Sequence, residues 1–184
     1  MTFDEIKQLI DEHNVQYADL RFTNTKGKEQ HITLPIHLIT ESFFSDGKLF
    51  DGSSMPGWCT INKSDMLLMP VDGPVFLDPF FKVPTIIIRC DILDPTTLAG
   101  YEKDPRSIAR RAENFMRSEG IADEAFFGPE LEFYMFDGIR FKHDMSGCMY
   151  QIEDYEAAWN SDKEFADRPN LGHRPMVQGG YFPV

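Results

Sequence analysis

The sequence is poor in cysteine and has no long apolar segment. Its three cysteines form no C-x-x-C pair, which argues against a disulfide framework and against a thiolate zinc site. The mostly apolar segment at residues 85–90 is far too short to span a bilayer. The first five residues read MTFDE and lack the basic and apolar regions of a signal peptide. We therefore expect a reduced, cytoplasmic protein with no membrane as a partner.

Positive charge is scarce as well. Lysine and arginine total 18 against 30 aspartates and glutamates, which gives a formal net charge of -12 at pH 7. Such a chain repels the phosphates of DNA and RNA, so a nucleic acid is not an expected partner. The two common nucleotide-binding loops, G-x-x-x-x-G-K-S/T and G-x-G-x-x-G, are both missing. No two of the five histidines have the H-x-x-x-H spacing of a helical metal site.

Hydrophobic periodicity predicts a compact α+β unit in residues 1–103. A capping box formed by Thr2 and Glu5 opens a helix that extends to about residue 13. Strands are expected at residues 17–23, 30–34, 65–69, 75–77 and 85–93. Asp104 followed by Pro105 is typical of a helix start, so we place a domain boundary just before Asp104.

The second part, residues 104–184, shows fewer regular elements after its first helix. The expected elements are a strand over Glu130–Phe136, a hairpin turn at 137–138, a return strand over 139–142, an irregular segment over 144–150 and a loop over 161–174. The sequence ends on the apolar stretch GGYFPV, whereas termini are more often polar. This ending predicts a truncated chain or a damaged gene.

Residues 50–54 read FDGSS and form the first candidate site. Two serines and a glycine beside Asp51 predict a tight loop that is rich in hydrogen bonds. Taken alone, this pattern favours an Asx turn, in which Asp51 caps its own backbone. The functional alternative is an anionic pocket for a cation or an amine.

Glu130 and Glu132 form the second candidate site. On a strand, residues two apart share a face, so the two carboxylates point one way while Leu131, Phe133 and Met135 point to the core. Carboxylates about 6–7 Å apart along a strand repel each other unless a cation lies between them. Without further information, a solvated polar strand face is slightly favoured over a metal site.

Both sites belong to a longer pattern. FDGSS is followed after eight residues by KSD at 63–65 and then by Leu68. Further along, the chain reads IIRCDI at 87–92, DPR at 104–106, FGPELEF at 127–133 and GGYFP at 179–183. In this long, gapped pattern the chain resembles the glutamine synthetases, in particular the bacterial type I enzymes, over nearly its whole length. Leu131 stands where that family usually has a second proline, which is a conservative change in packing.

The resemblance implies a fold and a reaction. It implies an α+β fold, with a β-grasp-like N-terminal domain in residues 1–103 and the truncated start of an α/β glutamine synthetase catalytic domain in residues 104–184. The implied reaction is the ATP-dependent ligation of ammonia to L-glutamate through a γ-glutamyl phosphate. The implied small-molecule partners are therefore glutamate, ammonium and ATP.

The resemblance also implies roles for the two sites. Asp51 would hold the ammonium ion and take its proton, and Ser54 would support this catalytic pocket. Glu130 and Glu132 would bind Mg²⁺ or Mn²⁺, ions that prefer oxygen ligands, in the nucleotide-phosphate site. The remaining metal ligands, the glutamate-binding residues and most of the nucleotide site would lie beyond Val184, so the chain alone is expected to be inactive.

The family forms stacked double hexameric rings, which implies neighbouring subunits as partners. The resemblance further implies that the ammonium-binding loop of one subunit completes the catalytic pocket of its ring neighbour. Two alternatives stay open at this point. The chain could be a non-catalytic assembly protein of the same fold, or a related ligase that uses another amine.

Overall fold

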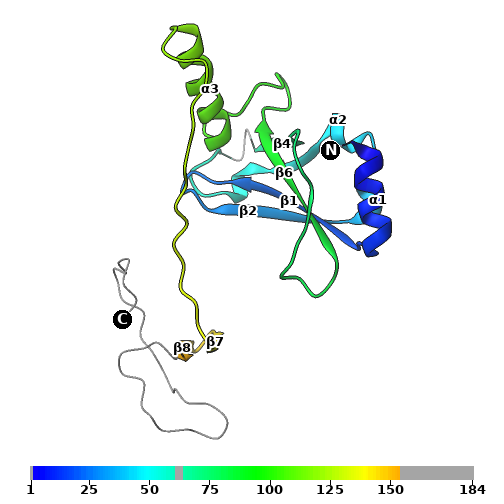
Figure 1. Cartoon of the computed structure of the whole chain (residues 1–184), viewed down its shortest axis with the longest axis vertical. Coiled ribbons are helices and arrows are strands. Elements are labelled where there is room, and N and C mark those ends of the chain that lie inside the picture. Colours follow the sequence, from blue (N-terminus) through cyan, green and yellow to red (C-terminus); the bar gives the residue numbers. More distant parts are fainter. Residues whose placement is uncertain (1, 61–63, 154–184) are drawn as a thin grey trace, which may run out of the picture. The chain divides into compact units, whose positions relative to one another are not determined.

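We describe a computed structural model of the protein, which places residues 2–60 and 64–153 (Figure 1). Contacts divide the chain into two compact units, Met1–Phe126 and Phe127–Val184, which are described separately below. No helix in the part that the structure describes is long and apolar enough to cross a membrane.

The first unit contains a mixed sheet, three α-helices and two short 3₁₀ helices. The helices are α1 (Phe3–His13), η1 (Ile36–Leu38), α2 (Phe43–Asp46), η2 (Gly52–Ser54) and α3 (Pro105–Ser118). The strands are β1 (Tyr17–Thr23), β2 (Glu29–Pro35), β3 (Lys48–Asp51), β4 (Asp65–Pro70), β5 (Phe76–Leu77) and β6 (Thr85–Leu93). The capping box at the start of α1 is confirmed, because Thr2 and Glu5 each accept a hydrogen bond from the other's backbone N–H.

The sheet runs in the order β2-β1-β6-β4-β3, and β5 pairs with β6 beside this path. β1 lies parallel to β6 and antiparallel to β2, while β4 and β5 both run antiparallel to β6. A mixed sheet with separate helices makes the unit α+β, as predicted. The expected five strands are all present, and the four-residue β3 is an additional strand that the hydrophobic pattern did not reveal.

Alternate residues of the two central strands point into one hydrophobic core. The core side chains of these strands are Ala18, Leu20 and Phe22 of β1 and Ile86, Ile88, Cys90 and Ile92 of β6. Helix α1 packs along this side of the sheet and buries Ile6 to 2% exposure (Figure 1). Because strand side chains alternate, a slip of one residue in either strand would turn this whole apolar set out of the core.

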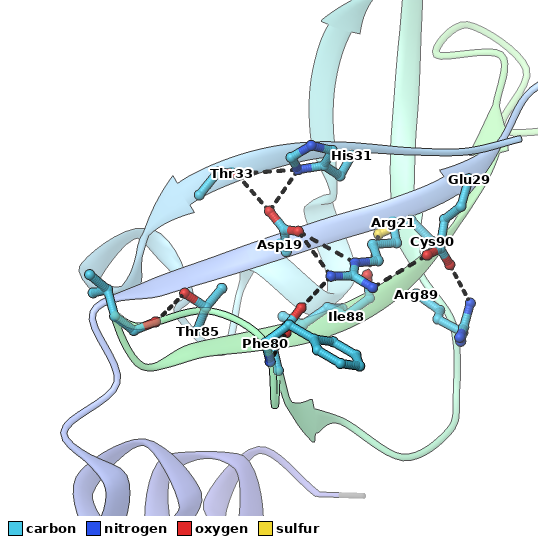
Figure 2. Close-up of polar contacts among 12 residues, drawn as sticks. Asp19, Arg21, Glu29, His31, Thr33, Phe80, Thr85, Ile88, Arg89 and Cys90 are labelled. Carbon is cyan, nitrogen blue, oxygen red and sulfur yellow. Dashed lines mark hydrogen bonds and ion pairs between the residues drawn. The ribbon is translucent and has the colours of Figure 1, made fainter. Parts of the chain in front are cut away.

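The other face of the same strands carries a network of charged side chains (Figure 2). Asp19, only 1% exposed, accepts a hydrogen bond from the Thr33 hydroxyl at 2.6 Å and contacts His31 Nδ1 at 2.9 Å. Arg21 lies 3.4 Å from the same carboxylate and reaches Asp78 at 2.5 Å. Asp19 and Arg21 therefore bind strand β2 and the loop after β5 to strand β1.

The second unit contains the antiparallel hairpin of β7 (Gly138–Asp144) and β8 (Gly147–Glu153). The turn expected at residues 137–138 and the irregular segment expected at 144–150 are both wrong. Residues 145–146 make the turn, where the Asp144 carboxylate accepts hydrogen bonds from the N–H and the hydroxyl of Ser146. Gly147 follows with a φ of 143°, which residues with a side chain rarely adopt. The sequence thus offers two possible hairpin turns, one at residues 137–138 and one at residues 145–146. The hairpin forms at the second, which an Asx turn stabilises.

The strand expected over Glu130–Phe136 is also wrong for the described part of the chain. Residues 124–136 form no helix and no strand there. A strand needs a neighbour that pairs with its backbone, and none of the described segments supplies a ladder for this one. The loop expected over residues 161–174 and the apolar ending lie outside the described residues.

Candidate functional site

The FDGSS segment places Asp51 at the last position of β3, where the chain enters η2. One carboxylate oxygen of Asp51 accepts hydrogen bonds from the backbone N–H of Ser53 at 2.8 Å and from its hydroxyl at 2.6 Å. This is the Asx turn that the sequence favours, and it caps η2. The hydroxyl that supports Asp51 in the described structure is that of Ser53, whereas the role expected for Ser54 stays a prediction.

The electrostatics of this turn keep Asp51 negatively charged. The hydrogen bond from the Ser53 hydroxyl, followed by that from its backbone N–H, lowers the pKa of Asp51 below the ordinary value. Asp65 lies directly opposite Asp51 in the register between β3 and β4, so two exposed carboxylates face each other across the strands. Like charges in this position repel, and a bound cation would relieve the repulsion.

Gly52 fixes the start of the loop against β4. Its backbone N–H donates to the carbonyl of Ser64 at 2.7 Å. A Cβ atom at this position would lie 2.7 Å from Met66 Cγ and 3.1 Å from Cys59 Sγ. A side chain at Gly52 would therefore push the loop away from the sheet, and with it the carboxylate of Asp51.

The far end of the loop is held by Trp58, which is 1% exposed. Its indole ring packs against Phe22, Phe50 and Tyr101, with ring centroids 5.8, 6.2 and 5.6 Å away. Burial, followed by the charge of Asp51, raises the pKa of the neighbouring Cys59 thiol. Cys59 is therefore protonated near neutral pH and poorly suited to act as a nucleophile.

An open cleft of about 960 Å³ lies beside this loop. Its lining includes Trp58, Cys59, Thr60, Ser64, Asp65, Met66, Asp94, Thr96, Thr97, Tyr101, Glu102 and Lys103. Three of these side chains are acidic and one is a lysine, so the cleft offers negative charge beside Asp51. A small polar cation suits such an environment better than an anion.

Glu130 and Glu132 lie in the second unit, in the segment without a strand, and both are exposed. The expected inward orientation of their neighbours is wrong for the described part of the chain, because Leu131, Phe133 and Met135 are 84%, 77% and 79% exposed. No described segment packs over these apolar side chains.

The two glutamates offer carboxylate oxygens, which are the ligands that Mg²⁺ and Mn²⁺ prefer. Among residues 2–60 and 64–153, however, no three His, Cys, Asp or Glu side chains gather as a metal site requires. The donor chemistry of Glu130 and Glu132 therefore fits a divalent ion, and it supplies only part of a ligand shell. Asp51 belongs to the first unit and the two glutamates to the second.

Sequence reasoning missed two residues that hold the Asp51 loop. The Tyr101 hydroxyl and the Lys103 ammonium group both donate to the backbone carbonyl of Trp58. No motif signals this contact, because its partners lie 43 and 45 residues apart and one of them is a backbone atom.

Comparisons with known proteins agree over the whole chain. Residues 14–95 match the model of the glutamine synthetase β-grasp domain, and residues 102–184 match that of the glutamine synthetase catalytic domain. The glutamine synthetases of Methylococcus capsulatus and Escherichia coli K12 are 56% and 55% identical to this chain over all 184 residues. The chain spans 39% of the length of each of these relatives.

A solved structure supports the fold. The glutamine synthetase of Plasmodium falciparum superimposes with a TM-score of 0.65 at 24% identity, covering 91% of this chain and 33% of that one. At this identity the likeness speaks for the fold alone. The two domain models show that the chain belongs to the glutamine synthetase family, of which it carries the β-grasp domain and the first part of the catalytic domain.

Proposed function

We propose that this chain forms the N-terminal part of an enzyme that joins ammonia to L-glutamate at the expense of ATP, through a γ-glutamyl phosphate. The observation that carries the proposal is the geometry of Asp51, an exposed carboxylate fixed in a tight turn whose pKa is lowered by Ser53. The 55% identity to a glutamine synthetase over the full chain supports it. Alone, the chain is expected to be inactive, since it spans 39% of that relative.

Asp51 performs the task that the nitrogen substrate requires. Ammonium is the abundant form of this substrate near neutral pH, and it has no lone pair with which to attack. A fixed carboxylate binds the cation and accepts its proton, which releases ammonia as the nucleophile. Ser53 orients the carboxylate by its two hydrogen bonds, and Ser54, the next residue of the loop, carries the second hydroxyl that is proposed to support this pocket.

Glu130 and Glu132 are proposed to bind Mg²⁺ or Mn²⁺ beside the phosphates of ATP. An ion held there would supply positive charge against the phosphates, which would ease the approach of the side-chain carboxylate of glutamate to the terminal phosphoryl group. The carboxylates of this chain hold the ion through hard oxygen donors and leave most of its coordination positions to other ligands. ATP is accordingly the co-substrate.

The proposed domains are residues 1–103 and residues 104–184, with the boundary just before α3. In support, the two family models match on either side of residues 96–101. The compact units divide later, at 126–127, because Asp91 on β6 binds α3 to the first unit through Arg106 and Arg110. The proposed partners of the complete protein are neighbouring copies in a double hexameric ring, within the cytoplasm.

A chimera tests the function. We would replace the matching N-terminal 39% of the E. coli relative with this chain and measure phosphate release that requires ATP, glutamate and ammonium. The unaltered chimera is expected to be active, and Asp51→Asn is expected to lower kcat/KM for ammonium by about 10²–10⁴-fold. Asp72→Asn, an exposed aspartate of the same unit, is the matched control and should change little.

Other results would point to the alternatives. A chimera that assembles but has no activity would favour a non-catalytic assembly protein of the same fold. Turnover with methylamine but not with ammonium would favour a related ligase. Full activity of the Asp51→Asn chimera would contradict the role of Asp51.

A further inference from the structure

The loop that carries Asp51 is fastened at its far end by residues that lie just ahead of α3. The carbonyl oxygen of Trp58 accepts a hydrogen bond from the Tyr101 hydroxyl at 2.5 Å and one from Lys103 Nζ at 2.6 Å. Lys103 Nζ also donates to the carbonyl of Gly57 at 3.1 Å. We call these three hydrogen bonds, made by Tyr101 and Lys103 to Gly57 and Trp58, the clasp.

Two successive turns connect the clasp to Asp51. The backbone N–H of Trp58 donates to the carbonyl of Met55 at 3.2 Å, and that of Met55 donates to the carbonyl of Gly52 at 3.1 Å. Gly52 follows Asp51 directly and is held to the residue before β4, because its N–H donates to the carbonyl of Ser64 at 2.7 Å. A displacement of Trp58 is therefore passed through two short hydrogen-bonded turns to the position of the Asp51 carboxylate.

The base of the clasp is itself rigid. Asp104 is fully buried and caps α3 by accepting hydrogen bonds from the N–H groups of Arg106 and Ser107. Arg106 in turn donates to Asp91 on β6 at 2.7 Å. Tyr101 and Lys103 thus extend from a short segment that is anchored to the central strand of the sheet.

Packing alone does not account for the clasp. The indole of Trp58 is already buried among aromatic rings, and its Nε1 has no hydrogen-bond partner among the described residues. The backbone carbonyl of Trp58, by contrast, accepts two hydrogen bonds, and one of the two donors is the ammonium group of Lys103. Hydrogen bonds from charged donors are stronger than neutral ones, and they fix the direction of the peptide.

From these contacts we infer that Tyr101 and Lys103 are positioning residues for the amine site: they set where the loop holds the Asp51 carboxylate. This inference rests on the proposed function, since it gives Asp51 the task of binding ammonium. It assigns Tyr101 and Lys103 no contact with the substrate. Both residues lie in the short segment that leads into α3, at the end of the proposed N-terminal domain, so this segment takes part in orienting the loop.

The first test uses the chain itself. Trp159→Phe leaves Trp58 as the only tryptophan, so its fluorescence reports on the end of the loop. In this background Lys103→Met and the nearly isosteric Tyr101→Phe are expected to raise the acrylamide quenching constant by about twofold or more, because the loop opens locally. Lys103→Arg should restore the parent value, and Lys26→Met, in the exposed turn between β1 and β2, should not change it. Unchanged quenching in both clasp variants would overturn the inference.

The second test uses the chimera with the E. coli relative and two amines. Ammonium must be bound as a cation and deprotonated, whereas hydroxylamine is uncharged near neutral pH and makes less use of Asp51. Lys103→Met and Tyr101→Phe are expected to raise KM for ammonium by about tenfold, the equivalent of one strong hydrogen bond. KM for hydroxylamine and for glutamate should change much less, and Lys103→Arg should restore the KM for ammonium.

The outcomes separate the inference from the proposed function. If the unaltered chimera shows no ammonium-dependent activity, the proposed function fails and the inference fails with it. If the chimera is active but the clasp variants raise KM for both amines equally, or leave KM unchanged, the proposed function stands and the inference alone is overturned. Far-UV circular dichroism of each variant shows whether the sheet is intact, and Tyr101→Phe keeps the test decisive if Lys103→Met does not fold.

Discussion

The buried carboxylate of Asp19 stabilises the fold through its contacts with Thr33, His31 and Arg21. Burial by itself would raise its pKa, but hydrogen bonds from Thr33 and His31 and the nearby charge of Arg21 outweigh burial and hold the pKa below its ordinary value. A carboxylate with a lowered pKa in the folded state stabilises the fold at every pH above its unfolded pKa, near 4. That stabilisation is lost as the pH falls from about 4 through the lower folded value.

We therefore expect Asp19→Asn to lower the free energy of unfolding at pH 7 by about 1–3 kcal/mol, because it removes a charge from a buried network. The difference from the parent chain should shrink below about pH 4, where the parent also loses this charge. Urea unfolding of both chains from pH 7 down to about pH 3 measures this. Asp72→Asn, in an exposed turn, is the control, and a difference that grows toward acid would contradict the assignment.

Ser53 and Ser54 are expected to behave differently although they are neighbours. Ser53→Ala removes the hydroxyl that donates to Asp51, so the pKa of Asp51 should rise toward its ordinary value. Ser54→Ala keeps both hydrogen bonds of the Asx turn and should leave that pKa where it is. An NMR titration of the Asp51 carboxyl carbon compares the two variants directly. A larger shift in Ser54→Ala would show that the other hydroxyl supports the carboxylate.

Some of the residues that hold the Asp51 loop could be predicted from the sequence, and others could not. The Asx turn at Asp51 was predictable, because it depends on residues two apart in the chain. Tyr101 and Lys103 were not predictable, because their partner is a backbone carbonyl whose position depends on how the whole sheet folds. Local chemistry is encoded in a short motif, whereas a long-range contact to a main-chain atom has no sequence signature.

At the scale of the elements, helix α3 is capped at its N-terminus by a single side chain, that of Asp104. Asp104 caps it with both carboxylate oxygens, which accept from Arg106 N–H and from the N–H and hydroxyl of Ser107. Replacing such a cap by alanine usually costs about 0.5–2 kcal/mol. We expect Asp104→Ala to reach the upper part of this range, because the carboxylate is fully buried. Urea unfolding measures the loss, Asp104→Ser should recover part of it, and an alanine variant as stable as the parent would refute the cap.

The predictions of strands were correct in the first unit, whereas the strand predicted over Glu130–Phe136 in the second unit was wrong. In the first unit the expected strands formed, because each alternates or runs apolar and finds a pairing neighbour within the same unit. In the second unit the pattern of Glu130–Phe136 suggested a strand, but no described segment pairs with it. Periodicity reports which side chains could share a face, and it cannot supply the neighbouring backbone that makes a strand. The same limit explains why the hairpin turn was placed eight residues too early.

For the chain as a whole, metal binding is expected to be weak. Glu130 and Glu132 supply at most a few of the six oxygen ligands that Mg²⁺ requires, and no third acidic or histidine ligand joins them among the described residues. Calorimetry with Mg²⁺ or Mn²⁺ should therefore give a dissociation constant no tighter than about 1 mM. Micromolar binding that disappears in Glu132→Ala would show instead that this chain already holds a nearly complete site.

The last prediction concerns how many copies of the protein are needed for one active site. The family resemblance implies that Asp51 of one subunit serves the pocket formed by its neighbour, which makes physical sense because a cleft between packed subunits encloses substrates and excludes water. Two inactive chimeras with the E. coli relative, one carrying Asp51→Ala and the other Glu132→Ala, should then restore activity when they assemble together. In a randomly mixed ring, a site with both residues intact arises in about a quarter of the positions, so about a quarter of the parent activity should return.

Mixing after separate assembly is the control, since preformed rings that do not exchange subunits should stay inactive. A chimera that carries both substitutions, mixed with either single variant, should restore no activity, because neither chain of that mixture supplies the residue that the single variant lacks. If co-assembled Asp51→Ala and Glu132→Ala chimeras show no activity above the separate ones, each site must draw both residues from one chain. The shared site would then be wrong for this protein, while the separate roles of Asp51 and of the two glutamates would still stand on their own single-variant tests.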